Sequence, residues 1–481
     1  MNKTKLAFAL ALLFLTSCTK NESANPSAER IAAIENGLTP SRILASDTRE
    51  SFNIYERMAK HNVPGVSIAV IRNNEIEWAK GYGLRDKAVG DSVTSETLFQ
   101  AASISKPVAA VGALTLVEAE KVALDENVND QMKSWRLPEN GLTESEKVTL
   151  RRLVSHSAGL TVHGFRGYAK GENVPSTTEV LDGNGPANSA PVRVDLTPGS
   201  EWRYSGGGYT VMQLLAQDVS GEGFVDFMQK NVLDKIGMNN SSYEQPLPEA
   251  KHAQAATGYR GNGKKVTGDW HTYPEMAAAG LWTTPTDLAK FAIEIIKANA
   301  GESKKVISQE MTQKLLERQS GNYGLGVSLR ESGAFGHGGA NEGFRCMLIA
   351  YPDRGEGAAV MTNSDNGGAL AAEILNAVSA AYDWPDYKPE ILETATISQE
   401  RLEQHAGEYF LEDNSQITLT LKVGENKLIA KVSIMSDAMI FHPQKQDEFF
   451  TLSNPARLHF PAEGPDAVIR GMGPERNFIR K

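Results

Sequence analysis

Ser103 and Lys106 stand three residues apart in the stretch QAASISKPVAA, residues 100–110. A serine hydroxyl attacks a carbonyl at neutral pH only when a neighbouring base takes its proton and when donors hold the developing oxyanion. Residues at i and i+3 share one face of a helix, so Lys106 can reach Ser103 if both lie in the first turn. There the positive end of the helix dipole favours the alkoxide and lowers the pKa of a lysine, and partial burial of the lysine lowers its pKa further.

The spacing alone is weak, because Ser17 and Lys20 have it too. Two further stretches strengthen the case. PGSEWRYSGGGYTV holds Tyr204 in a turn-like run just before a helix, and FGHGGANEGFRC holds His337 at the edge of a glycine-rich strand. Two more side chains that can exchange or orient protons therefore accompany Ser103 and Lys106.

These motifs together resemble the serine β-lactamase-like superfamily, in the branch of class C β-lactamases, D-alanyl-D-alanine carboxypeptidases, D-aminopeptidases and related esterases. Ser103-Ile104-Ser105-Lys106 matches the Ser-x-x-Lys motif. Tyr204-Ser205-Gly206 stands at the second motif, often Tyr-x-Asn, and His337-Gly338-Gly339 at the third, usually Lys-Thr-Gly in β-lactamases. LVSHSAGL, residues 153–160, resembles a family segment with a His-Thr-Ser-Gly core. The resemblance runs from about residue 50 to 385.

The resemblance implies a role for each matching residue. Ser103 would be the acylated nucleophile, and Lys106 would help to deprotonate it. Tyr204 would exchange protons with the nucleophile and the leaving group, which a phenol does as a base only if neighbouring cations lower its pKa. His337 would orient the substrate or assist proton transfer.

The segment after His337 would bind the substrate. The backbone N–H groups of Ser103 and Ala340 would form the oxyanion hole. Gly338 and Gly339 would let a substrate backbone lie against the strand edge, and Asn341 would partly replace a missing amide contact.

Two departures from the family pattern bear on the substrate. Gly206 stands where many members have a substrate-binding asparagine, and His337 stands where β-lactamases have a cationic lysine that attracts a carboxylate. Both changes favour aminopeptidase-like or esterase-like activity over efficient β-lactamase or strict carboxypeptidase activity.

The pattern along the chain predicts the elements that position these residues. Strand-like runs at 65–70 and 75–83 are separated by a hairpin turn at Asn73 and Asn74. Helical patterns follow at 104–122, 206–221, 223–238 and 284–301, then strands at 323–330, 343–352 and 357–364 and a helix at 369–382. We expect an α+β fold in which an antiparallel sheet, closed by the two ends of residues 46–388, is flanked by helices and an all-α region.

From about residue 400 the helical signal vanishes and short strands predominate. Residues 395–481 are predicted to form a separate small β-barrel or sandwich, which resembles the lipocalin-like appendage of some family members. It could bind a ligand itself, but we favour a role in shaping access to the active site or assembly.

The N-terminus indicates export. Lys3 and Lys5 precede a short apolar run that ends at LTSC, which resembles the lipobox of bacterial lipoproteins. Residues 1–17 would be the signal peptide, Cys18 the lipidated first residue and residues 18–45 a polar tether. We expect a periplasm-facing lipoprotein, anchored in the outer membrane.

Composition excludes several other functions. A net charge of −10 without a basic stripe argues against nucleic-acid binding. Cys346, the only cysteine besides Cys18, is expected to be a buried small side chain rather than a nucleophile. The spacing of His163, His252 and His271 fits no zinc site, so we expect neither metal nor cofactor.

Several further residues lie near the motifs. We expect His156 to be a satisfied structural histidine near the site. Two tryptophans flank motif-bearing segments, and two aromatic residues lie in a glycine-containing loop; these four candidates for packing or lining a pocket are Trp202, Trp282, Phe165 and Tyr168.

The prediction is a serine hydrolase that cleaves an amide or ester bond of a small molecule or peptide, including one derived from the cell wall, through an acyl-enzyme on Ser103. The alternative is a penicillin-binding or sensing lipoprotein with little or no turnover, its altered second and third motifs marking lost activity.

Overall fold

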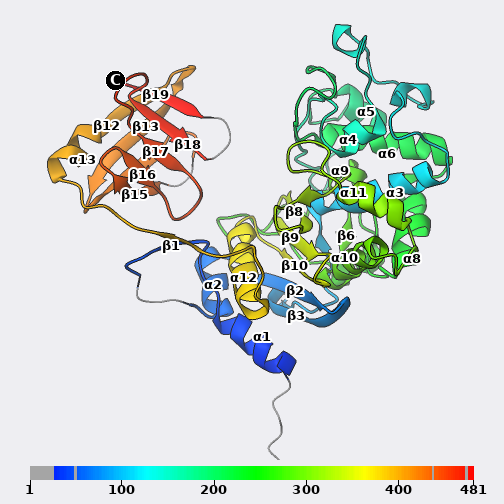
Figure 1. Ribbon diagram of the computed structural model, residues 1–481, viewed down its shortest axis with the longest axis horizontal. Helices are drawn as coiled ribbons and strands as arrows, with labels where there is room; N and C mark the ends of the chain where they lie inside the picture. The colour runs from blue at the N-terminus through cyan, green and yellow to red at the C-terminus, as the bar shows by residue number, and fades with distance from the viewer. Residues whose placement is uncertain (1–25, 48–50, 436–437, 472–474) are drawn as a thin grey trace, which may run out of the picture.

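The computed structural model describes residues 26–47, 51–435, 438–471 and 475–481. A seven-stranded antiparallel sheet with helices on both faces forms the main unit, and a closed eight-stranded barrel follows it (Figure 1). This arrangement confirms the predicted α+β class with a C-terminal β-barrel. In the part of the chain described, every helix is too short or too polar to cross a membrane.

The central sheet joins the two ends of the main unit. Its order is β4 (Asp91–Ser92), β3 (Glu75–Asp86), β2 (Gly65–Arg72), β10 (Glu356–Thr362), β9 (Phe344–Tyr351), β8 (Phe335–Asn341) and β7 (Ser328–Leu329). The sequence of β2, GVSIAVIR, is almost wholly buried because helices cover both faces of the sheet. The β2–β3 hairpin turns at Asn73 and Asn74, which both have positive φ, a conformation that asparagine tolerates.

Helices divide the apolar core in two. On one face, α1 (Pro26–Asn36), α2 (Ile54–His61) and α12 (Gly367–Tyr382) enclose the smaller part. On the other, α10 (Pro285–Asn299) and a helical region enclose the larger part. That region contains α3 (Ser105–Glu118), α4 (Leu150–Val154), α5 (Thr177–Asp182), α6 (Gly206–Ser220), α7 (Phe224–Met228), α8 (Asp234–Ile236), α9 (Met276–Ala279) and α11 (Gln309–Leu316). Two short strands, β5 (Phe99–Gln100) and β6 (Trp282–Thr283), pair beside it.

The segment expected to be a polar tether is folded from residue 26 onward, which corrects that prediction. Helix α1 packs on α12, and β1 (Arg42–Leu44) pairs in parallel with β11 (Glu390–Leu392). Ile34 and Leu38 are fully buried in the core beneath α12. Ile31 and Ile34 lie on the same side of α1, and Leu38 follows just after the helix. The polar residues of α1 obscure this short apolar side in the sequence.

The barrel closes through antiparallel pairing of all its strands around a core of leucine, phenylalanine and other apolar side chains. Its strands are β12 (Gly407–Leu411), β13 (Asn414–Gly424), β14 (Lys427–Val432), β15 (Met439–Lys445), β16 (Glu448–Phe450), β17 (Arg457–His459), β18 (Ala467–Arg470) and β19 (Arg476–Arg480). Helix α13 (Gln399–His405) precedes them, although the sequence predicted no helix beyond about residue 400. Ser398 caps its N-terminus, and the Ser398 hydroxyl accepts the N–H of Arg401.

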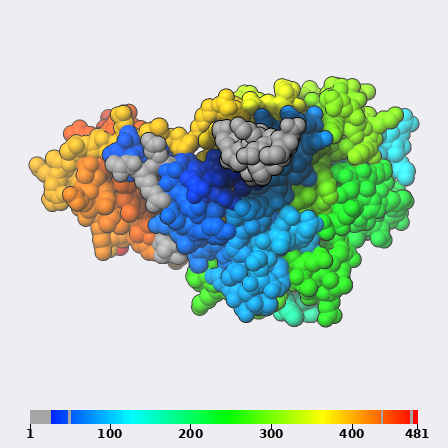
Figure 2. Space-filling model, turned by 90° about the horizontal axis from the view of Figure 1, so that it is seen from below, coloured from blue at the N-terminus to red at the C-terminus, as the bar shows by residue number. Residues whose placement is uncertain are grey.

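The barrel contacts the main unit through β1. Arg42 is buried and donates to the Glu390 carboxylate at 2.8 Å and to the carbonyls of Thr451 and Asn454 at 2.7 and 2.6 Å. Figure 2 shows the orange and red surface of the barrel beside the blue N-terminal segment. One arginine therefore ties together the N-terminal strand, the linker and the barrel.

Candidate active site

Ser103 lies where the chain turns from β5 into α3. It occupies a short 3₁₀ turn, Ala102–Ile104, in which Ala102 has a φ of +49°. Lys106 is the second residue of α3 and Pro107 the third, a position where the missing N–H costs no helical hydrogen bond. The Nζ of Lys106 donates to the Oγ of Ser103 at 3.0 Å. The predicted juxtaposition of the two residues is therefore present, with a 3₁₀ turn preceding the helix.

Lys106 is a buried amine without a carboxylate among its partners in the described residues. Its side chain is 2 % exposed, and its other hydrogen bond goes to the carbonyl of Ala278 at 2.8 Å. Burial disfavours the charged form and lowers the pKa of Lys106 to about 7. A substantial fraction of Lys106 is therefore neutral, and able to accept a proton, near neutral pH.

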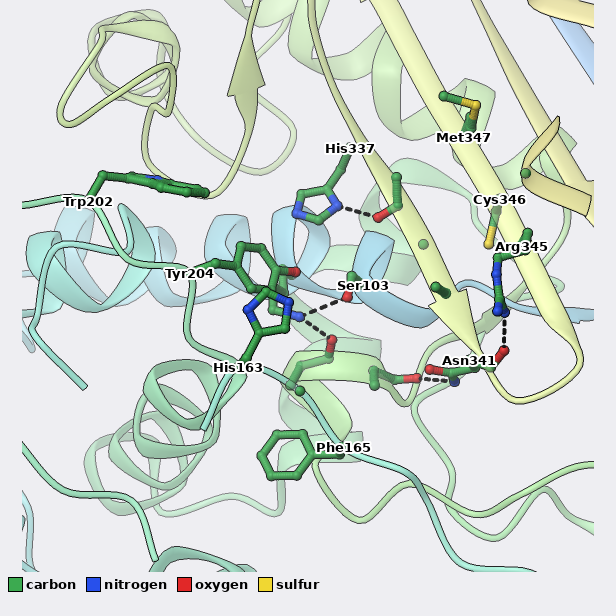
Figure 3. A pocket seen from close by; sticks show the side chains of 18 residues that line it. Ser103, His163, Phe165, Trp202, Tyr204, His337, Asn341, Arg345, Cys346 and Met347 are labelled. Carbon is green, nitrogen blue, oxygen red and sulfur yellow. Dashed lines mark hydrogen bonds between the residues drawn. The ribbon is translucent and has the colours of Figure 1, made fainter. Parts of the chain in front are cut away.

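The Tyr204 side chain points toward the same serine (Figure 3). It precedes α6, whose first turn is capped by the Ser205 hydroxyl accepting the N–H of Gly208. Burial raises the pKa of Tyr204 far above its ordinary value, and hydrogen bonding with Ser103 offsets only part of that shift. The phenol therefore stays protonated at neutral pH and can donate a proton.

His337 lies on β8 and is 9 % exposed. Its Nδ1 lies 2.5 Å from the carbonyl oxygen of Gly338, which can only accept, so Nδ1 carries the proton. Burial first, and then the charge of Lys106, lower the pKa of His337 to about 3. The ring is therefore neutral, and its buried Nε2, which has no partner among the described residues, is an acceptor. A lysine at this position would instead present a positive charge.

The strand edge beyond His337 alternates between solvent and protein. Gly338 and Ala340 are exposed, whereas Gly339 and Asn341 are buried. A Cβ on Gly339 would lie 2.3 Å from the carbonyl oxygen of Ala101, so only glycine allows β8 to approach the serine turn this closely. Both amide hydrogens of Asn341 are used within the protein: Nδ2 donates to Gln100 at 2.9 Å and to the Ala279 carbonyl at 3.1 Å. Only its Oδ1 is left for a substrate.

These residues line one cavity of about 640 Å³, shown in Figure 3. Its lining comprises Ser103, Lys106, His163, Gly164, Phe165, Trp202, Tyr204, Ala278, Ala279, His337, Gly338, Gly339, Ala340, Asn341, Arg345, Cys346, Met347 and Gly368. All predicted site residues except Cys18, which lies outside the described residues, therefore meet in one place. The lining is aromatic on one side and contains no carboxylate.

Sequence reasoning found some lining residues and missed others. Phe165 and Trp202 line the cavity, whereas Tyr168 accepts the N–H of Asn188 and Trp282 packs against Phe344. His163 and Arg345 were not predicted to line it. The signal for His163 is its place in the run that follows the LVSHSAGL segment; Arg345 stands eight residues after His337 on the neighbouring strand.

Two expectations about other groups can be compared with the structure. Cys346 is buried on β9, as expected, and burial raises the pKa of its thiol to about 12. Among the described residues, no three His, Cys, Asp or Glu side chains gather as metal ligands would.

A hydroxyl paired with a buried amine and a protonated phenol, on this α+β fold, defines a serine-hydrolase-like protein of the β-lactamase and penicillin-binding type. Residues 53–382 match the Beta-lactamase family model, and the chain belongs to that family. It is 21% identical over 338 residues to Protein flp of Staphylococcus aureus (strain N315), which covers 66% of this chain and 64% of flp. It is 23% identical over 324 residues to Penicillin-binding protein 4 of Amycolatopsis lactamdurans, covering 63% and 82% of the two chains.

One solved structure is similar to the chain over more residues than the main unit contains. The octameric penicillin-binding protein homologue from Pyrococcus abyssi has 22% identity and a TM-score of 0.60, covering 88% of this chain and 98% of its own. This likeness shows a shared fold.

Proposed function

We propose that the protein hydrolyses uncharged esters or amides through an acyl-enzyme on Ser103. Neutral Lys106 takes the proton of the Ser103 hydroxyl while Oγ forms a bond to the substrate carbonyl carbon. The N–H groups of Ser103 and Ala340 hold the oxyanion. The bond to the leaving group breaks as Tyr204 donates a proton to it, and water later releases the acid by the reverse sequence.

The hydrogen bonding of His337, with Nδ1 donating to the Gly338 carbonyl and Nε2 without a partner among the described residues, is the observation that carries the choice of substrate. Penicillins and peptides ending in D-alanine carry a carboxylate, which a cation at this position would attract. His337 offers only an Nε2 lone pair, which accepts a hydrogen bond from an N–H or O–H group. The lining also contains no carboxylate to bind a free α-ammonium group. Arg345 also lines the cavity, but its guanidinium is engaged by the carbonyls of Asn341 and Phe344 and by the Asp365 carboxylate. These features together favour a substrate that is uncharged around the scissile bond.

A substrate panel tests this proposal. Purified protein is assayed with p-nitrophenyl and alkyl esters, N-acylated and free D- and L-aminoacyl anilides, nitrocefin and a D-alanyl-D-alanine peptide. We expect turnover of esters or N-acylated anilides, slow turnover of the carboxylated substrates, and none by Ser103→Ala. Turnover by Ser103→Ala, or the highest kcat/KM on a carboxylated substrate, would contradict the proposal.

Covalent labelling separates hydrolysis from sensing. A fluorophosphonate should modify wild type at Ser103, as located by peptide mass, and should leave Ser103→Ala unlabelled. If a fluorescent penicillin instead gives a long-lived adduct while no substrate turns over, the sensing alternative is correct. This control is necessary because the chain is similar to a penicillin-binding protein and to a penicillin-binding protein homologue.

We also propose that the chain is exported and held at the periplasmic side of the outer membrane by a lipid on Cys18. The support is the LTSC sequence after a short apolar run. A Cys18→Ala variant should move from the membrane fraction to the soluble periplasmic fraction. An unchanged distribution would refute the anchor while leaving the hydrolase proposal intact.

A further inference from the structure

We propose that His156 is a positioning residue that fixes the Tyr204 phenol for proton donation to the leaving group. His156 is 1 % exposed and does not line the cavity, so it can act only through other residues. The inference rests on the proposed hydrolase function. It replaces the expectation that this histidine has only a structural role.

His156 bonds the chain on both sides of Tyr204. Its backbone carbonyl accepts the N–H of Arg203 at 2.7 Å, and its Nδ1 accepts the N–H of Ser205 at 3.1 Å. The two residues that flank Tyr204 are thus held by one residue. Rotation of the loop about Tyr204 would break at least one of these hydrogen bonds and leave a buried polar group without its partner, which is unfavourable.

The imidazole also packs directly on the phenol ring. Its centroid lies 4.2 Å from that of Tyr204, with the planes inclined by 34°. Behind it, the rings of Tyr209 and Tyr323 lie 5.2 and 4.8 Å away. The Tyr209 hydroxyl donates to the carbonyl of Val154 at 2.8 Å, which secures the chain just before His156. The imidazole of His156 is therefore held in a fixed position against the Tyr204 ring.

The backbone of His156 is in the left-handed region, with a φ of +59°. Residues other than glycine seldom adopt this conformation, although asparagine, aspartate and histidine do so more often than the rest. Where a non-glycine residue holds it, the surroundings enforce it. With this backbone conformation, both the carbonyl and the ring of His156 form hydrogen bonds to residues 203–205. Such strain beside a catalytic loop is expected where geometry matters more than stability.

His156 does not itself exchange protons in the reaction. Because Nδ1 accepts the Ser205 N–H, the proton resides on Nε2, which is buried and has no partner among the described residues. Burial first, and then the charge of Lys106, hold the pKa of His156 well below its usual range. His156 thus contributes by orienting the Tyr204 side chain. A double-mutant cycle measures this effect separately from the other effects of a substitution.

The test compares four proteins: wild type, His156→Phe, Tyr204→Phe and the double variant. The phenylalanine keeps a ring under Tyr204 and removes the acceptor for Ser205. On an alkyl ester, whose leaving group needs a proton, we expect His156→Phe to lower kcat at least tenfold with little change in KM, since a misplaced catalytic group costs up to about 10²-fold. In the Tyr204→Phe background the same change should cost less than twofold. His252→Phe, at an exposed histidine far along the chain, is the matched control and should retain kcat.

A second readout distinguishes positioning from general damage. Fluorophosphonate labelling expels a leaving group that needs no proton, so His156→Phe should be labelled at Ser103 within threefold of the wild-type rate. Equal losses of kcat in both Tyr204 backgrounds, labelling that falls in step with ester hydrolysis, or an unchanged kcat would each overturn the proposal. Failure of wild type to be labelled at all would instead overturn the hydrolase function.

His156→Asn extends the test if the phenylalanine variant does not fold. Asparagine tolerates positive φ and places an acceptor near the position of Nδ1. We expect a smaller loss of kcat than for His156→Phe, which again disappears in the Tyr204→Phe background. A loss that persists undiminished in that background would refute the role of His156.

Discussion

The Nζ of Lys106 lies over the ring of Tyr204, 4.9 Å from its centroid. Burial acts on both groups and disfavours the charged form of each, so it lowers the pKa of Lys106 and raises that of Tyr204. At neutral pH the pair therefore comprises an amine that can accept a proton and a phenol that can donate one. The pKa of Tyr204 is raised, so the condition under which this phenol would act as a base, a lowered pKa, is not met.

The pH dependence of activity should follow Lys106. Its pKa of about 7 means that the base form is lost as pH falls through this value. We expect kcat/KM for a neutral ester to rise tenfold per pH unit below about pH 7 and to level off above it. Arginine stays protonated at all working pH values, so Lys106→Arg should lose at least about 10³-fold. A wild-type profile that is flat from pH 5 to 8 would exclude Lys106 as the base.

Tyr204→Phe should be selective for the leaving group. Without its proton donor the enzyme should lose about 10²–10³-fold in kcat on an alkyl ester, within the usual range for general acid catalysis. The pre-steady-state burst with a p-nitrophenyl ester should change by less than about tenfold, because that leaving group departs as an anion. Equal losses with both substrates would show that Tyr204 acts on the nucleophile instead.

His337→Lys should change substrate preference. A cation at this position gains a charged hydrogen bond to a carboxylate, worth about 1.5–3 kcal/mol. We expect KM for a D-alanyl-D-alanine peptide to fall about tenfold or more, while KM for the corresponding C-terminal amide stays the same. Steady-state kinetics on this matched pair measures the effect, and an equal change for both peptides would contradict it.

Gly338 and Gly339 form a matched pair. A methyl group on Gly339 would meet the Ala101 carbonyl and the Cys346 sulfur, at 2.3 and 2.9 Å, and would force β8 away from Ser103. Gly339→Ala should therefore lose activity and about 1–3 kcal/mol of stability. The methyl group on Gly338 has its nearest neighbour at 3.9 Å, so Gly338→Ala should melt within about 2 °C of wild type but bind substrate more weakly, because it projects into the cleft. Thermal melts and KM values distinguish the two variants.

Glu275 makes stability fall as pH rises. It is fully buried, both carboxylate oxygens are without a partner among the described residues, and burial raises its pKa to about 8 from an ordinary 4.5. The folded state keeps a proton that the unfolded state releases above pH 4.5, so stability is lost progressively between about pH 4.5 and 8. Glu275→Gln should melt higher than wild type at pH 8, by more than it does at pH 5. Parallel melting curves at both pH values would show that Glu275 does not titrate in this way.

The sequence alone predicts which residues come together in the cavity when those residues lie at the boundaries of helices and strands. Ser103, Tyr204 and His337 each lie beside a helix start or a glycine-rich strand, where local patterns are strong. The protonation of Tyr204 and His337 was beyond sequence reasoning, since it depends on how deeply distant segments bury them. His156 illustrates the same limit, because its bonds to residues 203 and 205 cross about 50 residues of chain. Likewise, the sequence of α1 does not reveal that this helix is folded against the main unit, because its burial depends on packing against α12.

The strand order of the main sheet has a consequence for biosynthesis. Central strand β2 is paired on one side by β10, with Val66 opposite Thr362, and Arg57 forms its bidentate ion pair with Glu373. Almost 300 residues must therefore be made before the apolar edge of β2 is covered, and β1 waits still longer for β11. Contacts of such long range form slowly. The emerging polypeptide thus has an exposed, association-prone edge until its last quarter arrives, and needs chaperone protection or delayed folding during that interval.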